Sequence, residues 1–161
     1  MYGDGTQEAG AGAPNDDPYD LERFLTAQAG AYPAALEELR RGAKESHWMW
    51  FVFPQVAGLG SSAMAQRYAI RSLDEARAYV AHPVLGARLR ESAEALLHLQ
   101  GRTAHDVFGS PDDLKLRSSL TLFREATGDP VFSQVLARYF DGVGDAQTLR
   151  LLASPGTGRD A

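Results

Sequence analysis

The chain has 161 residues, about the length of one ordinary domain, and its 16 basic and 21 acidic residues give a formal net charge of −5. With 44% hydrophobic residues it can bury a core without a metal or a disulfide. The absence of cysteine excludes thiolate nucleophiles, cysteine zinc sites and iron–sulfur clusters. The acidic balance also argues against nucleic acid as the principal partner, because binding to phosphate backbones needs a cationic face.

The sequence shows no sign of a targeting or membrane segment. The stretch Met1 to Pro14 carries Asp4 and Glu8 and no basic residue, which is unlike a secretory or transit peptide. The longest unbroken apolar run, Trp48 to Phe53, is far too short to cross a bilayer. We therefore expect a soluble, cytoplasmic protein with no membrane partner.

The apolar composition favours helices. The chain has 25 Ala and 19 Leu but only nine Ile and Val together, and the first two promote helix whereas the last two promote sheet. Residues 1–16 are rich in Gly, Ala, Asp and Asn and have little to bury, which is typical of disorder. We predict a disordered tail at 1–16, a single compact all-α domain of about eight helices at 17–153, and a flexible C-terminus at 154–161.

Start and stop signals divide this domain. Asp17-Pro18, Ser110-Pro111 and Asp129-Pro130 each place a capping side chain before a proline, and Ser72 with Glu75 matches a capping box. Glycines follow several of the periodic apolar segments, as expected for helix ends. Helices are predicted at 18–30, 33–41, 46–53, 62–70, 73–81, 84–100, 111–127 and 130–141, with short turns at 104–108 and 145–152.

The segment Trp48-Met-Trp-Phe-Val-Phe53 is apolar throughout, so its periodicity does not distinguish a buried strand from a buried helical turn. A lone strand would leave its backbone N–H and C=O groups unpaired in a dry interior, and no second strand is evident. We therefore favour a short buried helix.

Several segments carry a family resemblance. They are Lys44-Glu-Ser-His-Trp-Met-Trp-Phe-Val-Phe-Pro-Gln55, Gly58-Leu-Gly-Ser-Ser62, Tyr68-Ala-Ile70, Ser72 to Leu89, and Phe108-Gly-Ser-Pro-Asp-Asp-Leu-Lys-Leu-Arg-Ser-Ser-Leu-Thr-Leu-Phe123. Together they resemble the bacterial domain-of-unknown-function family 1810 over roughly residues 17–141. The resemblance implies one all-helical domain and no established activity. The label calpastatin, sometimes attached to this family, does not fit, because that inhibitor is extended and disordered whereas this chain is patterned to fold.

One group of candidate binding residues lies on the helix that follows Ser110. Lys115, Ser118 and Ser119 line a strip beside the apolar face, and Asp112 lies one turn before Lys115. A partly buried ammonium near hydroxyls can hold an anion or carry a proton. The alternative is purely structural, with an Asp112–Lys115 ion pair and the two serines bonded to their own helix.

A second group surrounds the aromatic segment. His47 titrates near neutrality, Trp48 and Trp50 offer flat walls, and Gln55 and Tyr68 add hydrogen-bonding groups. The structural alternative places the histidine at the rim of the core and the tryptophans within it. No histidine pair or carboxylate cluster has the spacing of metal ligands, so we predict no metal. The Gly58–Ser62 loop matches neither the P-loop nor the dinucleotide-binding fingerprint, so we predict no cofactor.

Two hypotheses for function follow. In the first, both groups form one inter-helix pocket that binds a small polar or anionic, nucleotide-like ligand, with hydrolase or transferase chemistry in which His47 or Lys115 carries the proton. In the second, the aromatic residues form an exposed patch that docks a protein partner without any chemistry.

Overall fold

The computed structural model describes residues 16–153, so residues 1–15 of the predicted tail and the predicted flexible C-terminus lie outside the described part. Within residues 16–153 every regular element is a helix, which confirms the all-α prediction. The helices are α2 (Glu22–Arg41), α3 (Met49–Val52), α4 (Ala63–Arg67), α5 (Leu73–Ala81), α6 (Leu85–His98), α7 (Ala104–Phe108), α8 (Asp112–Thr127), α9 (Pro130–Phe140) and α10 (Ala146–Ala153).

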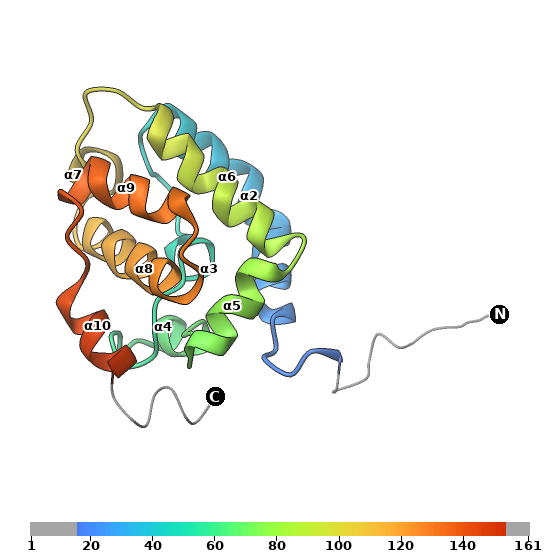
Figure 1. The fold of residues 1–161 in the computed structure, drawn as a ribbon. Helices are drawn as coiled ribbons and strands as arrows, with labels where there is room; N and C mark the ends of the chain where they lie inside the picture. The colour runs from blue at the N-terminus through green and yellow to red at the C-terminus, as the bar shows by residue number, and fades with distance from the viewer. Residues whose placement is uncertain (1–15, 154–161) are drawn as a thin grey trace.

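The helix α8 lies at the centre of the fold (Figure 1). It packs against α5, α7, α9 and α10, while α6 packs against α2, α5 and α9. Most of α8 is therefore buried, including Leu116, Leu120 and Phe123, which are fully enclosed. Its first turn, with Asp112 and Lys115, is less covered and carries the polar side chains toward the surface.

Two of the four predicted caps are confirmed, whereas Asp17 and Ser110 are not the N-caps of α2 and α8, whose N-cap residues are Leu21 and Pro111. The Asp129 side chain accepts a hydrogen bond from the N–H of Val131 at the start of α9, and Ser72 accepts one from the N–H of Glu75 at the start of α5. Gly42 and Gly128 end α2 and α8 in the left-handed conformation that glycine adopts without steric cost.

The prediction of two separate helices at 18–30 and 33–41 is wrong. The structure has one helix, α2, that continues through Pro33. Proline removes the hydrogen bond to the carbonyl of Ala29, four residues earlier. Because both Ala29 and Pro33 are exposed, water can reach that carbonyl, and the packing of α2 against α6 keeps the helix continuous.

The apolar segment after His47 forms the short helix α3, as predicted, and it is buried against α2. Beyond it, Val56 pairs with Ile70 in an isolated parallel bridge, in which Ala57 N–H donates to Ile70 O at 2.8 Å and Ile70 N–H donates to Gln55 O at 2.9 Å. The bridge places the loop 55–60 beside the segment that follows α4. Across residues 16–153, no helix combines the length and apolar character that a membrane crossing needs.

Candidate functional site

Both lysines of the chain converge on one carboxylate. Lys44 Nζ lies 2.9 Å from Asp112 Oδ2, and Lys115 Nζ lies 3.5 Å from Asp112 Oδ1. Lys44 comes from the loop after α2, whereas Asp112 and Lys115 are one turn apart at the start of α8. We call these three residues the lysine cluster, and it carries one net positive charge.

Each lysine also lies over a tryptophan. Lys44 Nζ is 5.1 Å from the ring centroid of Trp48, and Lys115 Nζ is 5.7 Å from that of Trp50. At such distances the negative face of the indole attracts the ammonium group. The contact between Lys115 and Trp50 joins the two groups of candidate residues, which are far apart in the sequence.

The two ammonium groups differ in how many N–H donors remain available to a ligand. The side chain of Lys44 is 8% exposed and donates a hydrogen bond to Ser46 O at 2.7 Å in addition to its ion pair with Asp112. The side chain of Lys115 is 30% exposed, and within residues 16–153 its ammonium has no charged partner except Asp112. Lys115 is therefore the lysine whose ammonium keeps N–H groups available to a ligand.

Glu38, on α2, fixes the segment that links Lys44 to the tryptophans. Its carboxylate accepts hydrogen bonds from the N–H groups of Glu45 and Ser46 at 2.9 and 3.0 Å, from Ser46 Oγ at 2.5 Å, and from Trp48 Nε1 at 2.8 Å. Burial alone would raise the pKa of Glu38, but these hydrogen bonds outweigh burial and lower it to about 2.

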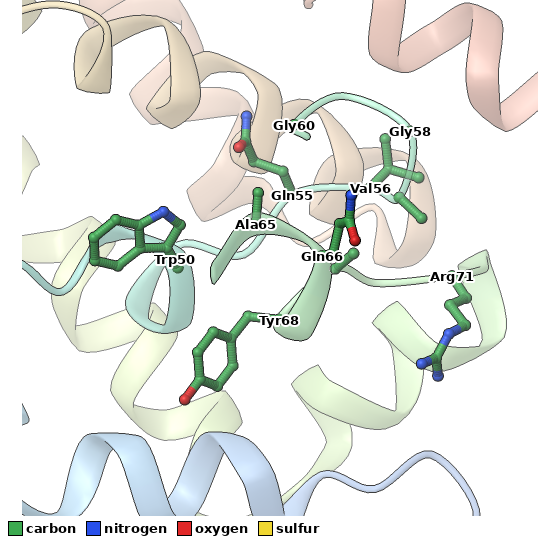
Figure 2. A pocket seen from close by; sticks show the side chains of 11 residues that line it. Trp50, Gln55, Val56, Gly58, Gly60, Ala65, Gln66, Tyr68 and Arg71 are labelled. Carbon is green, nitrogen blue, oxygen red and sulfur yellow. The ribbon is translucent and has the colours of Figure 1, made fainter. Parts of the chain in front are cut away.

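Two adjoining hollows lie beside the lysine cluster. The first has a volume of about 150 Å³ (Figure 2). It is lined by Trp50, by residues 55–58 and Gly60 of the following loop, and by Ala65, Gln66, Tyr68, Ala69 and Arg71. The second has a volume of about 200 Å³. It is lined by Gln55, Leu59 and Gly60 and by residues at the start of α8, including Lys115 and Ser118. Gln55 and Gly60 line both hollows, so they form the partition between them.

A buried ion pair anchors the wall of the first hollow. Arg23 Nη2 lies 2.8 Å from Glu75 Oε2, with 7% and 1% of the two side chains exposed. Arg23 also donates to the carbonyls of Arg67 and Ala69 at 2.9 Å each. Because Ala69 lines the hollow, the ion pair fixes the backbone of this part of the lining.

The structure brings five of the predicted site residues to the hollows. Trp50 and Tyr68 line the first, Lys115 and Ser118 line the second, and Gln55 lines both. Asp112 lies next to them through its contact with Lys115. The hydroxyl groups of Tyr68 and Ser118 are already engaged, since the former accepts from Arg67 Nε at 3.3 Å and the latter donates to Leu114 O at 3.2 Å.

Three other predicted residues lie apart from the hollows. Trp48 is 1% exposed and belongs to the core, where its ring packs against Phe53 and Phe108. Ser119 is fully buried, and its hydroxyl has no partner within the described residues. His47 is exposed at the surface and is not part of either lining.

The sequence analysis missed two cationic residues of this region, Lys44 and Arg71. The scarcity of lysine was a usable signal for Lys44, because it applies to both lysines equally. Arg71 lines the first hollow immediately before the cap of α5, and nothing in its sequence surroundings distinguishes it from the other arginines. Within residues 16–153, no group of three or more His, Asp or Glu side chains is placed to hold a metal ion.

The fold and the hollows thus define a small helical protein with a cationic cleft beside one buried and one half-buried tryptophan. The chain belongs to the family described as "Protein of unknown function (DUF1810)", which matches residues 18–152. It is similar to a crystal structure of the conserved hypothetical protein Rv1873 from Mycobacterium tuberculosis, with 53% sequence identity and a TM-score of 0.84. That match covers 86% of this chain and 99% of the other. Comparison with the curated proteins gives no match.

Proposed function

We propose that the protein binds a small anionic ligand with a flat ring, of the size and charge of a mononucleotide or smaller, in the two hollows. The observation that carries this proposal is the placement of Lys115. Its ammonium lies 5.7 Å from the Trp50 ring centroid and lines the hollow that adjoins the one lined by Trp50. A cation with unfilled donors next to an aromatic wall suits a ligand that joins an anionic group to a ring.

The charge of the linings supports an anionic ligand. The described residues that line the two hollows include the cations Arg71 and Lys115 but no Asp or Glu, although the chain has a net charge of −5. Two larger surface depressions elsewhere do contain carboxylates: Glu91 and Glu94, with Arg40, in one, and Asp16, Asp17 and Glu22 in the other. An anion would be repelled there and attracted here.

The size of the first hollow supports a single ring. Its volume of about 150 Å³ equals that of an engineered apolar cavity that accepts benzene. A six-membered ring fits such a space, and the adjoining second hollow leaves room for a charged substituent near Lys115.

The burial of the aromatic residues favours this ligand pocket over an exposed docking patch for a protein partner. Trp48 is 1% and Tyr68 is 7% exposed, so neither offers its ring to a partner surface. Hydrolysis or group transfer stays a prediction. Of the two proton carriers predicted from the sequence, Lys115 is the one that lines a hollow.

A thermal-shift screen of nucleotides, sugar phosphates and amino acids tests the proposal. A ligand at a concentration of about 100 times its Kd stabilises the folded state by about 2.7 kcal/mol, which raises the melting temperature of a chain of this size by about 5–10 °C. We expect at least one anionic ring compound to give such a shift with the wild type and with the control variant Arg40→Gln, and little or no shift with Lys115→Met.

The control removes one positive charge from an exposed position on α2, where the side chain is 62% exposed and lines neither hollow. A ligand that stabilises Lys115→Met as much as the wild type would place the binding site elsewhere. If no anionic ring compound stabilises the wild type at millimolar concentration, the proposed function is wrong.

A further inference from the structure

The backbone of Arg71 is held by a hydrogen bond, whereas its side chain has no polar partner among the described residues. Its N–H donates to Glu75 Oε1 at 3.1 Å, and the other carboxylate oxygen of Glu75 is held by Arg23. The side chain of Arg71 is exposed, and among the described residues its guanidinium has neither a hydrogen bond nor an ion pair. The negative charge of Glu75 is compensated by Arg23, so the charge of Arg71 is available to a ligand.

The cations stand at different ends of the paired hollows. In Figure 2 Trp50 and Arg71 lie at opposite ends of the residues that line the first hollow, with Gln55 and Gly60 between them, and the Arg71 side chain extends away from that loop. Lys115 lies over Trp50, so it belongs to the end that is remote from Arg71. A ligand that fills the first hollow and reaches Lys115 would have its other end on the side of Arg71, whose exposed side chain can turn toward it.

From this arrangement, and resting on the proposed function, we infer that the ligand is a single-ring compound with anionic groups at both ends, and that Arg71 is its second anion contact. Lys115 holds one group as a point charge, whereas the planar guanidinium of Arg71 can hold a carboxylate or phosphate through two parallel hydrogen bonds. A compound with one anionic group leaves one of the two cations without a partner.

Gln55 would lie beside the middle of such a ligand. It lines both hollows, and its amide makes no hydrogen bond to other described residues, whereas the neighbouring Gln66 donates to Ser61 O at 3.0 Å. The free amide offers both a donor and an acceptor to the middle of the ligand. Gln55 therefore suits recognition of a polar ring edge.

Two synthetic compounds of nearly identical shape test the inference. We would titrate 4-carboxyphenyl phosphate and 4-carbamoylphenyl phosphate into the full chain by isothermal titration calorimetry. Both carry phosphate on a single ring, but only the first has a second anionic group at the opposite end. With the wild type and with Arg40→Gln we expect the carboxylate compound to bind about tenfold more tightly, as one added ion pair of moderate strength provides.

In Arg71→Gln and in Lys115→Met the ratio of the two affinities should fall to about one, because the single remaining cation can hold only one group. A ratio near one in the wild type, a preference that persists in Arg71→Gln, or no binding of either compound would overturn the inference. If binding depends on Lys115 but not on Arg71, the proposed function survives and this inference does not. The thermal-shift screen decides the proposed function separately.

Discussion

The Glu38 carboxylate shows how a single buried side chain positions the lysine cluster. It accepts four hydrogen bonds from the segment that follows Lys44, including the one from the Trp48 indole. Lys44 in turn donates to Ser46 O in that segment and pairs with Asp112. A change at Glu38 should therefore affect both the stability of the fold and the position of the cluster.

We expect Glu38→Gln to lower the free energy of unfolding at neutral pH by about 2 kcal/mol. The amide keeps one acceptor oxygen but loses the charge that strengthens the hydrogen bonds, and its NH₂ group faces N–H and O–H donors that had bonded to the carboxylate. Urea unfolding followed by circular dichroism measures the loss. An unchanged unfolding midpoint would show that these hydrogen bonds do not stabilise the fold.

The stabilisation by Glu38 should also depend on pH. The pKa of Glu38 is about 2 in the folded protein against an ordinary value of 4.5. A depressed carboxyl pKa stabilises the fold above the unfolded value, and this contribution is lost as the pH falls toward the folded value. Between about pH 5 and pH 2 the wild type should lose about 3 kcal/mol that Glu38→Gln does not lose. A difference between the two proteins that stays constant over this range would contradict the assignment.

Individual site residues were only partly predictable. Lys115 stands out in the sequence because lysine is rare here and because it lies on a strip beside an apolar helix face. The sequence does not reveal that Trp48 points into the core and Trp50 toward a hollow, since both lie within one apolar run. Arg71 owes its position to the Val56–Ile70 bridge and to Glu75, which are contacts between distant segments.

The corner between α5 and α6 requires a glycine. A Cβ at Gly86 would lie 1.9 Å from the carbonyl oxygen of Val80, which is backbone and cannot move aside easily. At Gly30, inside α2, an added Cβ would meet nothing within 4 Å. The two glycines therefore allow a matched comparison, because both lie in helices but only Gly86 has no room for a Cβ.

We expect Gly86→Ala to destabilise the protein by at least about 3 kcal/mol, because the methyl group forces the two helices apart. Gly30→Ala should stabilise it by about 0.5–1 kcal/mol, because alanine has the higher helix propensity. Thermal unfolding of the two variants beside the wild type gives both signs. Equal effects of the two substitutions would contradict the close approach at Gly86.

Pro33 allows a test of the continuity of α2. We expect Pro33→Ala to raise the free energy of unfolding by about 1–2 kcal/mol, because alanine restores the hydrogen bond to Ala29 O and the lost rigidity of the unfolded chain offsets only part of that gain. Chemical denaturation measures the change. Destabilisation would indicate that the proline ring is needed for packing.

Helix positions were the most predictable feature. The caps Ser72 and Asp129 and the stop Gly128 are local signals, so α5 and α9 begin, and α8 ends, where the sequence places them. The break predicted near Pro33 failed because the packing of α2 against α6 outweighs the local cost of proline. Likewise, the Val56–Ile70 bridge could not be predicted, because neither of its segments has the length or alternation of a strand.

Over the whole molecule, the paired hollows depend on segments from four parts of the chain. The α2 helix supplies Arg23, the segment after it supplies Trp50 and Gln55, the region around α4 and α5 supplies Tyr68 and Arg71, and α8 supplies Lys115. The meeting of the aromatic segment with α8 was expected from the sequence. The hollows themselves were not, because volumes depend on how the whole chain packs.

The indole N–H resonances of the two tryptophans test the proposed site most directly, because one of them serves as an internal control. Trp48 Nε1 donates to Glu38 inside the core, whereas Trp50 is half-buried and lines the first hollow. Nuclear magnetic resonance spectra of the ¹⁵N-labelled protein would be recorded during titration with phenyl phosphate, with Trp50→Phe to assign the two peaks. The proposed site predicts a saturable shift of the Trp50 peak that Lys115→Met abolishes, with the Trp48 peak nearly unmoved. Saturable binding that leaves the Trp50 peak in place would contradict it.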